Sequence, residues 1–211
     1  ALLLAACTPA QAESVVKLPA AAYDPAVAAP RATAVLAGGC FWGVEGVLER
    51  VKGVIAVESG YHGGAKETAV YEITNNGRTG HAEAVRVTYD PRVVSYGTLL
   101  RVLFSVIADP TLRNRQGPDV GSQYRAAIVP LDATQRAVAT RYLTQIGTGK
   151  HFARPIVVPI ERYKAFYRAE DYHQDFMKRN PDHGYIRRWD APKLAALKRL
   201  FPDLVNAKPA A

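Results

Sequence analysis

The sequence predicts an α+β domain, with one β-sheet and a layer of helices packed against it. Short runs of apolar and β-branched residues, typical of buried strands, alternate with stretches in which apolar residues recur at helical spacing. The connections are too irregular for a doubly wound sheet, and the polar connection Asp109–Ser122 is long enough to carry function. We therefore expect a two-layer sandwich with a ferredoxin-like split-βαβ core and long functional loops.

The elements are expected in the following order along the chain. Strands are predicted at Thr33–Ala37, Val54–Gly60, His81–Tyr89, Gln123–Val129 and Ile156–Ile160. Helices are predicted at 44–51, from about Ser95 to Ile107, from Asp132 to about Gln145, at Ala169–Asn180 and at Ala191–Leu200. Asp132 and Gln135 resemble a capping box, and Pro181 should end the fourth helix. The segment 68–75 fits neither pattern.

Composition narrows the classes of protein that the chain can represent. The chain has 211 residues and a formal net charge of +8, and this length suits one substantial domain. The basic residues are scattered, with pairs such as Arg187–Arg188 but no long basic run, so nucleic-acid binding is not expected. No apolar stretch of 18 or more residues follows residue 7, so no later segment should span a membrane. We expect a monomer.

The first residues resemble the end of a signal peptide. Leu4-Ala5-Ala6-Cys7 is similar to the bacterial lipobox, in which the cysteine is lipidated after cleavage. Two alternatives stay open: cleavage after Ala12, which would discard Cys7, and a fortuitous apolar start. The first two interpretations predict export to the periplasm or cell envelope, with a lipid-bearing Cys7 holding the protein on the membrane surface. Residues 1–31 are thus expected to be a signal-peptide remnant and flexible linker, 32–205 the globular domain, and 206–211 a disordered tail.

Cys40 lies in Gly38-Gly39-Cys40-Phe41-Trp42-Gly43, between the first predicted strand and the first predicted helix. At the start of a helix, free N–H groups and the helix dipole stabilise a thiolate, so we expect a pKa below the ordinary value of about 8.5. The glycines allow a tight turn, and the two aromatic residues offer an apolar surface beside the sulfur. The alternative is a small buried hydrophobic residue with core aromatics beside it. A reactive cysteine therefore needs partner groups elsewhere in the chain.

Four residues are candidates for that partnership. Glu83 lies near the start of a predicted strand, on a face that becomes apolar further along, and desolvation there would raise its pKa as a general acid requires. Tyr61 and Tyr124 adjoin glycine turns and can donate phenolic hydrogen bonds, and Asp119 lies in the long loop. The alternatives are a solvent-facing glutamate, structural tyrosines and a turn-forming aspartate. No paired ligand spacing supports a metal site, and no cofactor is expected.

Five motifs in order resemble the A-type peptide methionine sulfoxide reductases, over about residues 33–204. They are Gly39-Cys40-Phe41-Trp42-Gly43, Gly60-Tyr61-x-Gly63-Gly64, Thr79-Gly80-His81-Ala82-Glu83, Asn114-Arg115-Gln116-Gly117-x-Asp119-x-Gly121-Ser122-Gln123-Tyr124-Arg125 and Ala169-Glu170-Asp171-Tyr172-His173-Gln174. Enzymes of this class reduce methionine sulfoxide back to methionine.

The resemblance implies a mechanism that fits these residues. Cys40 would attack the sulfoxide sulfur, and Glu83 would protonate the sulfoxide oxygen. Tyr61 and Tyr124 would donate hydrogen bonds to that oxygen, and Asp119 would help to position the site. The oxygen becomes more basic as the sulfur is attacked, so these donors help most in the transition state. Cys40 would be left as a sulfenic acid.

The resemblance also bears on the substrate and the reductant. Phe41 and Trp42 would pack against the ε-methyl group and select the S epimer, in proteins or in the free amino acid. No cysteine follows Cys40, and Ile186 stands where many relatives have a resolving cysteine, so the chain resembles the single-cysteine branch. A lipidated or excised Cys7 cannot reduce the sulfenic acid. An external thiol, from a thioredoxin-like protein or a small molecule, is therefore the expected reductant.

Two departures and two rival functions remain open. Ala108 replaces a histidine common in relatives, and Asn75-Asn76 replace a small pair, which leaves the substrate preference open. A thiol peroxidase would also use an activated cysteine, although a peroxide needs no pocket for a methyl group. The non-enzymatic rival is a surface lipoprotein that binds methionine-rich partners without turning them over.

Overall fold

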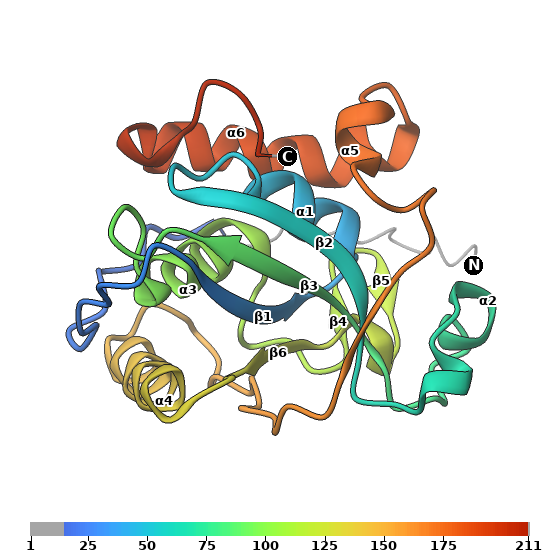
Figure 1. Ribbon diagram of the computed structural model, residues 1–211, viewed down its shortest axis with the longest axis horizontal. Helices are drawn as coiled ribbons and strands as arrows, with labels where there is room; N and C mark the ends of the chain where they lie inside the picture. Colours follow the sequence, from blue (N-terminus) through green and yellow to red (C-terminus); the bar gives the residue numbers. More distant parts are fainter. Residues whose placement is uncertain (1–14, 211) are drawn as a thin grey trace, which may run out of the picture.

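The computed structural model describes residues 15–210 and contains a five-stranded sheet in the order β6-β1-β3-β2-β7 (Figure 1). Every neighbouring pair of strands is antiparallel. The strands are β1 (Ala32–Gly38), β2 (Val54–His62), β3 (Ala82–Tyr89), β6 (Ala126–Val129) and β7 (Phe166–Arg168), and β4 (Arg115–Gln116) pairs separately with β5 (Asp119–Val120). The helices are α1 (Phe41–Leu48), α2 (Tyr71–Thr74), α3 (Tyr96–Val102), α4 (Ala133–Thr148), α5 (Phe176–Arg179) and α6 (Ala191–Leu200).

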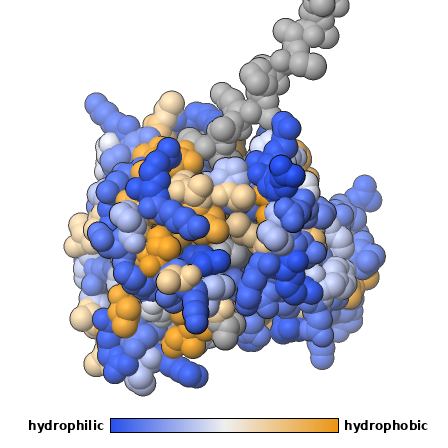
Figure 2. Space-filling view, turned by 90° about the horizontal axis from the view of Figure 1, so that it is seen from above, coloured by the Kyte–Doolittle hydropathy of each residue, from blue (hydrophilic) through white to orange (hydrophobic). Residues whose placement is uncertain are grey.

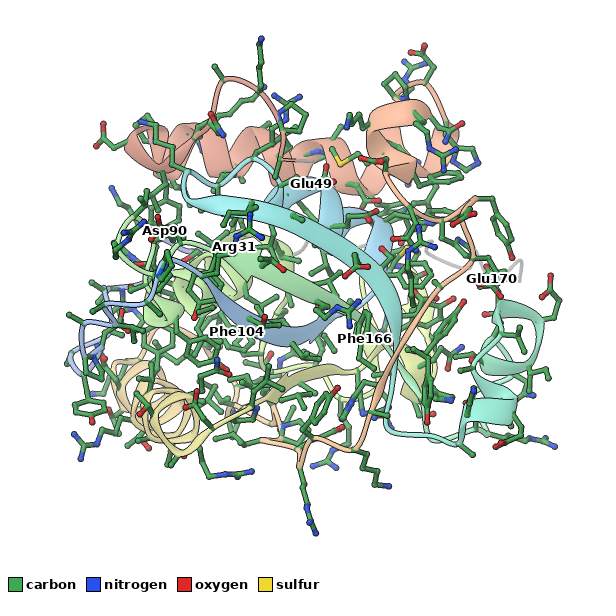
Figure 3. All side chains as sticks on the ribbon, in the orientation of Figure 1. Arg31, Glu49, Asp90, Phe104, Phe166 and Glu170 are labelled. Atoms are coloured by element: carbon green, nitrogen blue, oxygen red, sulfur yellow. The ribbon has the colours of Figure 1, made fainter. Side chains whose placement is uncertain are left out.

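The prediction of an α+β fold is confirmed. Helix α1 connects β1 to β2, and β3 lies between these two strands, which is the split-βαβ arrangement. Helix α3 makes the corresponding connection from β3 to β6. Sheet residues such as Leu36 and Val85 share one core with α1, α3, α4 and α6, and Phe104 lies in this core (Figure 3). A smaller cluster on the opposite face packs against Phe166.

Helix α6 runs beside α1 above the sheet in Figure 1, and the two helices are in contact. Figure 2 views the molecule from this side and shows hydrophobic residues gathered near the middle of the face, with hydrophilic residues around them. Within residues 15–210, no helix is both long and apolar enough to cross a membrane.

Two predicted elements differ from the structure. Residues 156–160 form only a single parallel bridge, between Ile160 and Ile128 of the edge strand β6, and the next strand along the chain is β7 at the opposite edge of the sheet. Pro155 and Pro159 explain this, because proline cannot donate a hydrogen bond to a sheet ladder. The helix expected at 169–180 is reduced to α5, because Asp175 adopts a left-handed conformation with φ of 53° and interrupts the helix there.

The predicted flexible linker is wrong for the part that the structure describes. Leu18 is completely buried, and its carbonyl accepts a hydrogen bond from Arg101 Nε at 2.7 Å. The Tyr142 hydroxyl donates to the Pro19 carbonyl at 3.1 Å. An apolar side chain in the core offsets the entropy lost by ordering this segment. The lipobox, with Cys7, lies outside the described residues.

The predicted disordered tail is also wrong for residues 206–210. The Asn206 N–H donates to the Arg50 carbonyl at 2.7 Å, and the Ala210 N–H donates to the Glu49 carbonyl at 2.9 Å. These bonds hold the tail against the residues that directly follow α1. The carbonyl groups at a helix end have no partner within the helix, so the tail can pair with them.

Candidate active site

Cys40 occupies the N-cap position of α1, directly after β1, as the strand-to-helix junction in the sequence predicts. Gly39 precedes it with φ of +93°, and a Cβ there would lie 2.6 Å from Gln116 Cβ, so only glycine fits this turn. The Cys40 residue is 8% exposed. It opens into a cavity of about 280 Å³ that is lined by Cys40, Phe41, Trp42, Tyr71, Glu83, Asp119, Tyr124, His183 and Tyr185.

Glu83 enters this cavity from β3 and is 2% exposed. Its Oε2 accepts the backbone N–H of Phe41 at 2.9 Å, so the carboxyl group is tied to the first turn of the helix that carries Cys40. Burial raises the pKa of Glu83 to about 8, and the charges of Asp119 and Asp190 add to this effect. Glu83 therefore carries a proton at neutral pH.

The predicted lowering of the Cys40 pKa is wrong. Burial raises the pKa of the thiol well above its ordinary value, and the carboxyl groups of Glu83, Asp190 and Asp119 raise it further. The Trp42 N–H bonds the sulfur and opposes these effects only in part. Desolvation and three nearby acids thus outweigh the helix N-terminus, and Cys40 is a thiol at neutral pH in this structure.

The two predicted phenols are placed differently from each other. Tyr124 lines the cavity, and its hydroxyl donates to Asn75 Oδ1 at 3.1 Å. Tyr61 does not line it: this side chain is completely buried and donates to Glu170 Oε2 at 2.9 Å. Tyr71 of α2 also lines the cavity, although the sequence did not single it out. Burial raises the pKa of Tyr71 and that of Tyr124, so both keep the protons that they can donate.

Tyr61 instead forms the layer beneath the cavity. It lies opposite Glu83 in the β2–β3 register, and its ring centroid is 5.9 Å from that of Phe41. Through its hydroxyl it holds Glu170, whose Oε1 accepts the backbone N–H of Tyr71 at 2.9 Å. Glu170 is labelled in Figure 3, beside α2. Tyr61 therefore supports the segment that presents Tyr71.

Asp119 lies in β5 at the edge of the cavity, where the long predicted loop brings it. The Tyr185 hydroxyl donates to Asp119 Oδ2, and burial raises the pKa of Asp119. His183 and Tyr185 line the cavity as well, and neither was a candidate from the sequence, where no periodic pattern or motif marks them.

Phe41 and Trp42 form the apolar wall beside the sulfur. The Trp42 indole stacks on Phe176 with ring centroids 3.8 Å apart, and its Nε1 donates to His173 Nδ1 at 3.0 Å. The Phe41 ring centroid lies 4.9 Å from that of His173. These contacts fix the wall on the side away from the cavity.

The opposite side of α1 is a separate environment. Met177, the single methionine of this sequence, is 9% exposed, and a Cβ at Gly46 would lie 2.5 Å from its Sδ. Ile186 and Glu49 line another cavity there, of about 260 Å³ (Figure 3 labels Glu49). Among the described residues, no group of three or more His, Cys, Asp and Glu side chains is arranged to hold a metal ion.

The fold and the site together define a thiol-dependent oxidoreductase. A cysteine at the start of a helix, a protonated carboxyl group and three phenols meet beside an apolar wall. The thiol can therefore attack a polarisable electrophilic atom while the carboxyl group protonates an oxygen bound to it.

Comparisons with known proteins identify the family. A family model described as "Peptide methionine sulfoxide reductase" matches residues 32–203. The "Peptide methionine sulfoxide reductase MsrA 2" of Mesorhizobium japonicum is 55% identical over 177 residues, 84% of this chain and 91% of the relative. MsrA of Deinococcus radiodurans is 49% identical over 170 residues, 81% of this chain and 82% of the relative.

A solved structure shows the same relationship. Methionine sulfoxide reductase A of Corynebacterium diphtheriae has a TM-score of 0.62 and 29% identity, covering 81% of this chain and 86% of that chain. The chain belongs to the A-type peptide methionine sulfoxide reductase family, as the sequence motifs indicated. It is an oxidoreductase of the peptide-methionine (S)-S-oxide reductase class.

Proposed function

We propose that the enzyme reduces the S epimer of methionine sulfoxide, in proteins and as the free amino acid, through a Cys40 sulfenic acid that an external thiol reduces. The observation that carries the proposal is the hydrogen bond between Glu83 and the Phe41 N–H, because it fixes a protonated carboxyl group beside the only described cysteine.

In the proposed reaction, the Cys40 sulfur forms a bond to the sulfoxide sulfur while Glu83 gives its proton to the sulfoxide oxygen. The thiol proton of Cys40 replaces the one that Glu83 has given. The S–O bond and the new S–S bond then break as the protonated oxygen passes to the Cys40 sulfur, so the sulfoxide is reduced by two electrons to methionine and the thiol is oxidised to a sulfenic acid. Glu83 thus gives one proton, receives another and ends as it began.

Tyr71 and Tyr124 support this step as hydrogen-bond donors to the oxygen. Both line the cavity with Cys40 and Glu83, and both stay protonated because burial raises their pKa values. Donors placed before the reaction stabilise negative charge that develops on the oxygen more than they stabilise the neutral sulfoxide. Tyr124 must exchange its bond to Asn75 for one to the substrate.

The selection of one epimer follows from the arrangement of the methyl group, the oxygen and the attacking thiol around the sulfoxide sulfur. A sulfoxide sulfur is pyramidal, so its methyl group, its oxygen and the face open to attack have a fixed handedness. The methyl group packs against the apolar wall of Phe41 and Trp42, and the oxygen receives a hydrogen bond from Glu83. Cys40 then approaches the remaining open face of the sulfur. A mirror-image sulfoxide places its oxygen against the wall or its methyl group against the acid, and both positions are unfavourable.

Regeneration by an external thiol is supported by what surrounds α1. No cysteine follows Cys40 in the sequence, and Ile186 is 1% exposed in the cavity on the other side of α1. The first thiol attacks the sulfenic acid to give a mixed disulfide and water. A second thiol then releases Cys40 and leaves as the oxidised reductant. A thioredoxin-like protein or a small thiol fits this role.

The proposal is tested by single-turnover chemistry on the two resolved epimers. We expect one methionine per enzyme from the S epimer without reductant, together with dimedone labelling of Cys40, and no methionine from the R epimer. Cys40→Ser should abolish both signals. Equal reduction of both epimers, or full turnover by Cys40→Ser, contradicts the proposal. Faster reaction with peroxide than with the sulfoxide would instead support the thiol peroxidase, and binding without turnover would support the non-catalytic rival.

A further inference from the structure

A charged pair lies behind the helix that carries Cys40. The π-helical segment Ile186–Asp190 continues directly into α6, and Lys193 Nζ lies 3.5 Å from Asp190 Oδ1, three residues earlier along the same helical stretch. Asp190 is 0% exposed and Lys193 is 5% exposed. The π-helical segment and α6 both contact α1 (Figure 1). The pair is therefore enclosed between the C-terminal elements and the catalytic helix.

The Asp190 carboxyl group is directed toward the first turn of α1. A Cβ at Gly43 would lie 2.2 Å from Asp190 Oδ1, so only a glycine leaves room for this approach. The backbone of Asp190 is helical, with φ of −97° and ψ of −37°, because the π-helical segment continues directly into α6. Its side chain makes no cap bond to α6, and its carboxyl group faces α1.

The pair acts on the ionisable groups of the active site. The charge of Asp190 contributes, after burial, to the raised pKa values of Cys40 and Glu83. Lys193 has the opposite effect on Asp119, whose pKa it lowers against the larger effect of burial. The titratable and charged groups that face the pair are Cys40 of α1, Glu83 of β3, Asp119 of β5 and the nearby Tyr185.

Stability alone gives a weak reason for such a pair. Burying two charges costs solvation that their attraction repays poorly, and apolar replacements of buried ion pairs are often neutral or stabilising. A charge in a dry interior does, however, act strongly on groups several ångströms away. The location beside the first turn of α1 is where such a charge reaches both the nucleophile and the acid.

We propose that Asp190, held by Lys193, is a positioning residue for sulfoxide reduction, whose negative charge keeps the proton on Glu83 until the sulfoxide oxygen receives it. This role rests on the function proposed above. A negative charge disfavours ionisation of its neighbours, so Glu83 stays an acid. Lys193, 3.5 Å from the Asp190 carboxyl group, limits the effect of that charge on its neighbours, including Cys40, which must lose its proton as it attacks. The pair therefore sets how firmly Glu83 holds its proton relative to how easily Cys40 loses its own.

Charge variants test this balance without the sulfoxide reaction. In a Cys7→Ala background, the rate of Cys40 alkylation by iodoacetamide is measured against pH. Asp190→Asn should move the profile lower by about one pH unit, with about tenfold faster alkylation below the midpoint. Lys193→Met should move the profile to higher pH, and Lys193→Arg should leave it in place. Damage to the structure alone would not move the two profiles in opposite directions.

The catalytic half of the proposal is tested on the S epimer. In the pH profile of kcat/KM, the falling limb that reports Glu83 should move to lower pH in Asp190→Asn. The matched control is Lys198→Met, because Lys198 is exposed on the same helix and its loss should leave both profiles unchanged.

Two results would overturn the proposal: no shift in Asp190→Asn, or shifts in the same direction in Asp190→Asn and Lys193→Met. If Lys193→Met does not fold, the proposal is still tested by Asp190→Asn, which should shift the profile, and by Lys193→Arg, which should not. Alkylation shifts in a protein that reduces neither epimer would reject the proposed function and, with it, the catalytic role of the pair.

Discussion

The carboxyl group of Glu83 and the backbone N–H of Phe41 are joined by a hydrogen bond of 2.9 Å. Because Phe41 directly follows Cys40, the acid and the nucleophile are fixed to the same helical turn. Strand β3 contributes Glu83, and the start of α1 contributes Cys40. One hydrogen bond between residues 42 positions apart in the sequence sets their relative position. The predictions below follow from this arrangement and from its surroundings.

Replacing the acid should slow catalysis without unfolding the protein. We expect Glu83→Gln to lower kcat by about 10²- to 10⁴-fold, because the amide cannot give up a proton. Its carbonyl oxygen can still accept the Phe41 N–H, so the Tm should change little. Since the raised pKa of Glu83 is about 8, wild-type activity should fall as pH rises through 8. A Glu83→Gln variant that keeps the wild-type rate or this falling limb would show that another group is the acid.

The cavity phenol Tyr71 and the buried phenol Tyr61 should have different effects when each is replaced. Tyr71→Phe removes a donor from the cavity and should lower kcat/KM by about tenfold, with little change in Tm. Tyr61→Phe removes the bond to Glu170 beneath the cavity, and its main effect should be a loss of stability of about 1 kcal/mol. Steady-state kinetics and thermal unfolding of both variants check this. The opposite assignment of effects would restore Tyr61 as the oxygen donor.

The variant Ile186→Cys should not form an internal disulfide with Cys40. Ile186 lines the cavity on the far side of α1, whereas Cys40 opens into the catalytic cavity. The measurement is a count of free thiols and a mass spectrum of the variant after one turnover without reductant, in a Cys7→Ala background. We expect a sulfenic acid and one free thiol. A disulfide between Cys40 and the introduced thiol would mean that the C-terminal segment moves during the reaction.

Two buried carboxyl groups on α1 and its C-terminal end should make stability depend on pH. Burial raises the pKa of Glu45 to about 7 and that of Glu49 to about 8, so the folded state holds protons that the unfolded state releases above about 4.5. Their contribution to the free energy of unfolding is therefore complete below pH 4.5 and is lost as pH rises toward 8.

The variant Glu49→Gln isolates this effect. The difference in free energy of unfolding between pH 5 and pH 9, measured by urea denaturation, should be smaller in the variant than in the wild type. The exposed Glu67→Gln is the control and should preserve the wild-type difference. An unchanged difference in Glu49→Gln would show that Glu49 ionises equally in both states.

The N-terminal segment should contribute to stability as part of the domain. Leu18→Ala should cost about 2–5 kcal/mol, since the side chain is completely buried in the core. Val27→Ala is the comparison, because Val27 is 41% exposed and should change stability by less than about 0.5 kcal/mol. Equal, small effects would indicate that the segment detaches in solution.

The sequence predicts what local patterns determine. Period-two alternation placed Glu83 on the buried face of β3, and the glycines at 38–39 placed Cys40 at a strand-to-helix turn. The pKa of Cys40 was predicted wrongly because the helix start is local, whereas the acids that raise this pKa come from β3, β5 and the C-terminal segment. Tyr71 was missed because α2 has four residues and shows no periodicity.

The remaining parts of the site depend on tertiary packing. Tyr61 has the expected strand position, but its ring packs against Phe41 and does not reach the cavity. The pattern of one strand cannot predict a contact with another element. Asp190 and Lys193 resemble surface charges at the start of an amphipathic helix. The packing of the π-helical segment and α6 against α1 buries them, with Asp190 beside Gly43. Such residues are recognised when the distances between elements are known.

The position of Met177 has a consequence for an enzyme that works where oxidants are present. Its Sδ lies against Gly46 of α1, and the residue also lines the cavity of about 260 Å³ on that side of the helix. An oxygen atom added to the sulfur would have to lie on the cavity side, because the side toward Gly46 has no room for it. The repair enzyme thus leaves its own methionine, which is 9% exposed, open to oxidants from one direction.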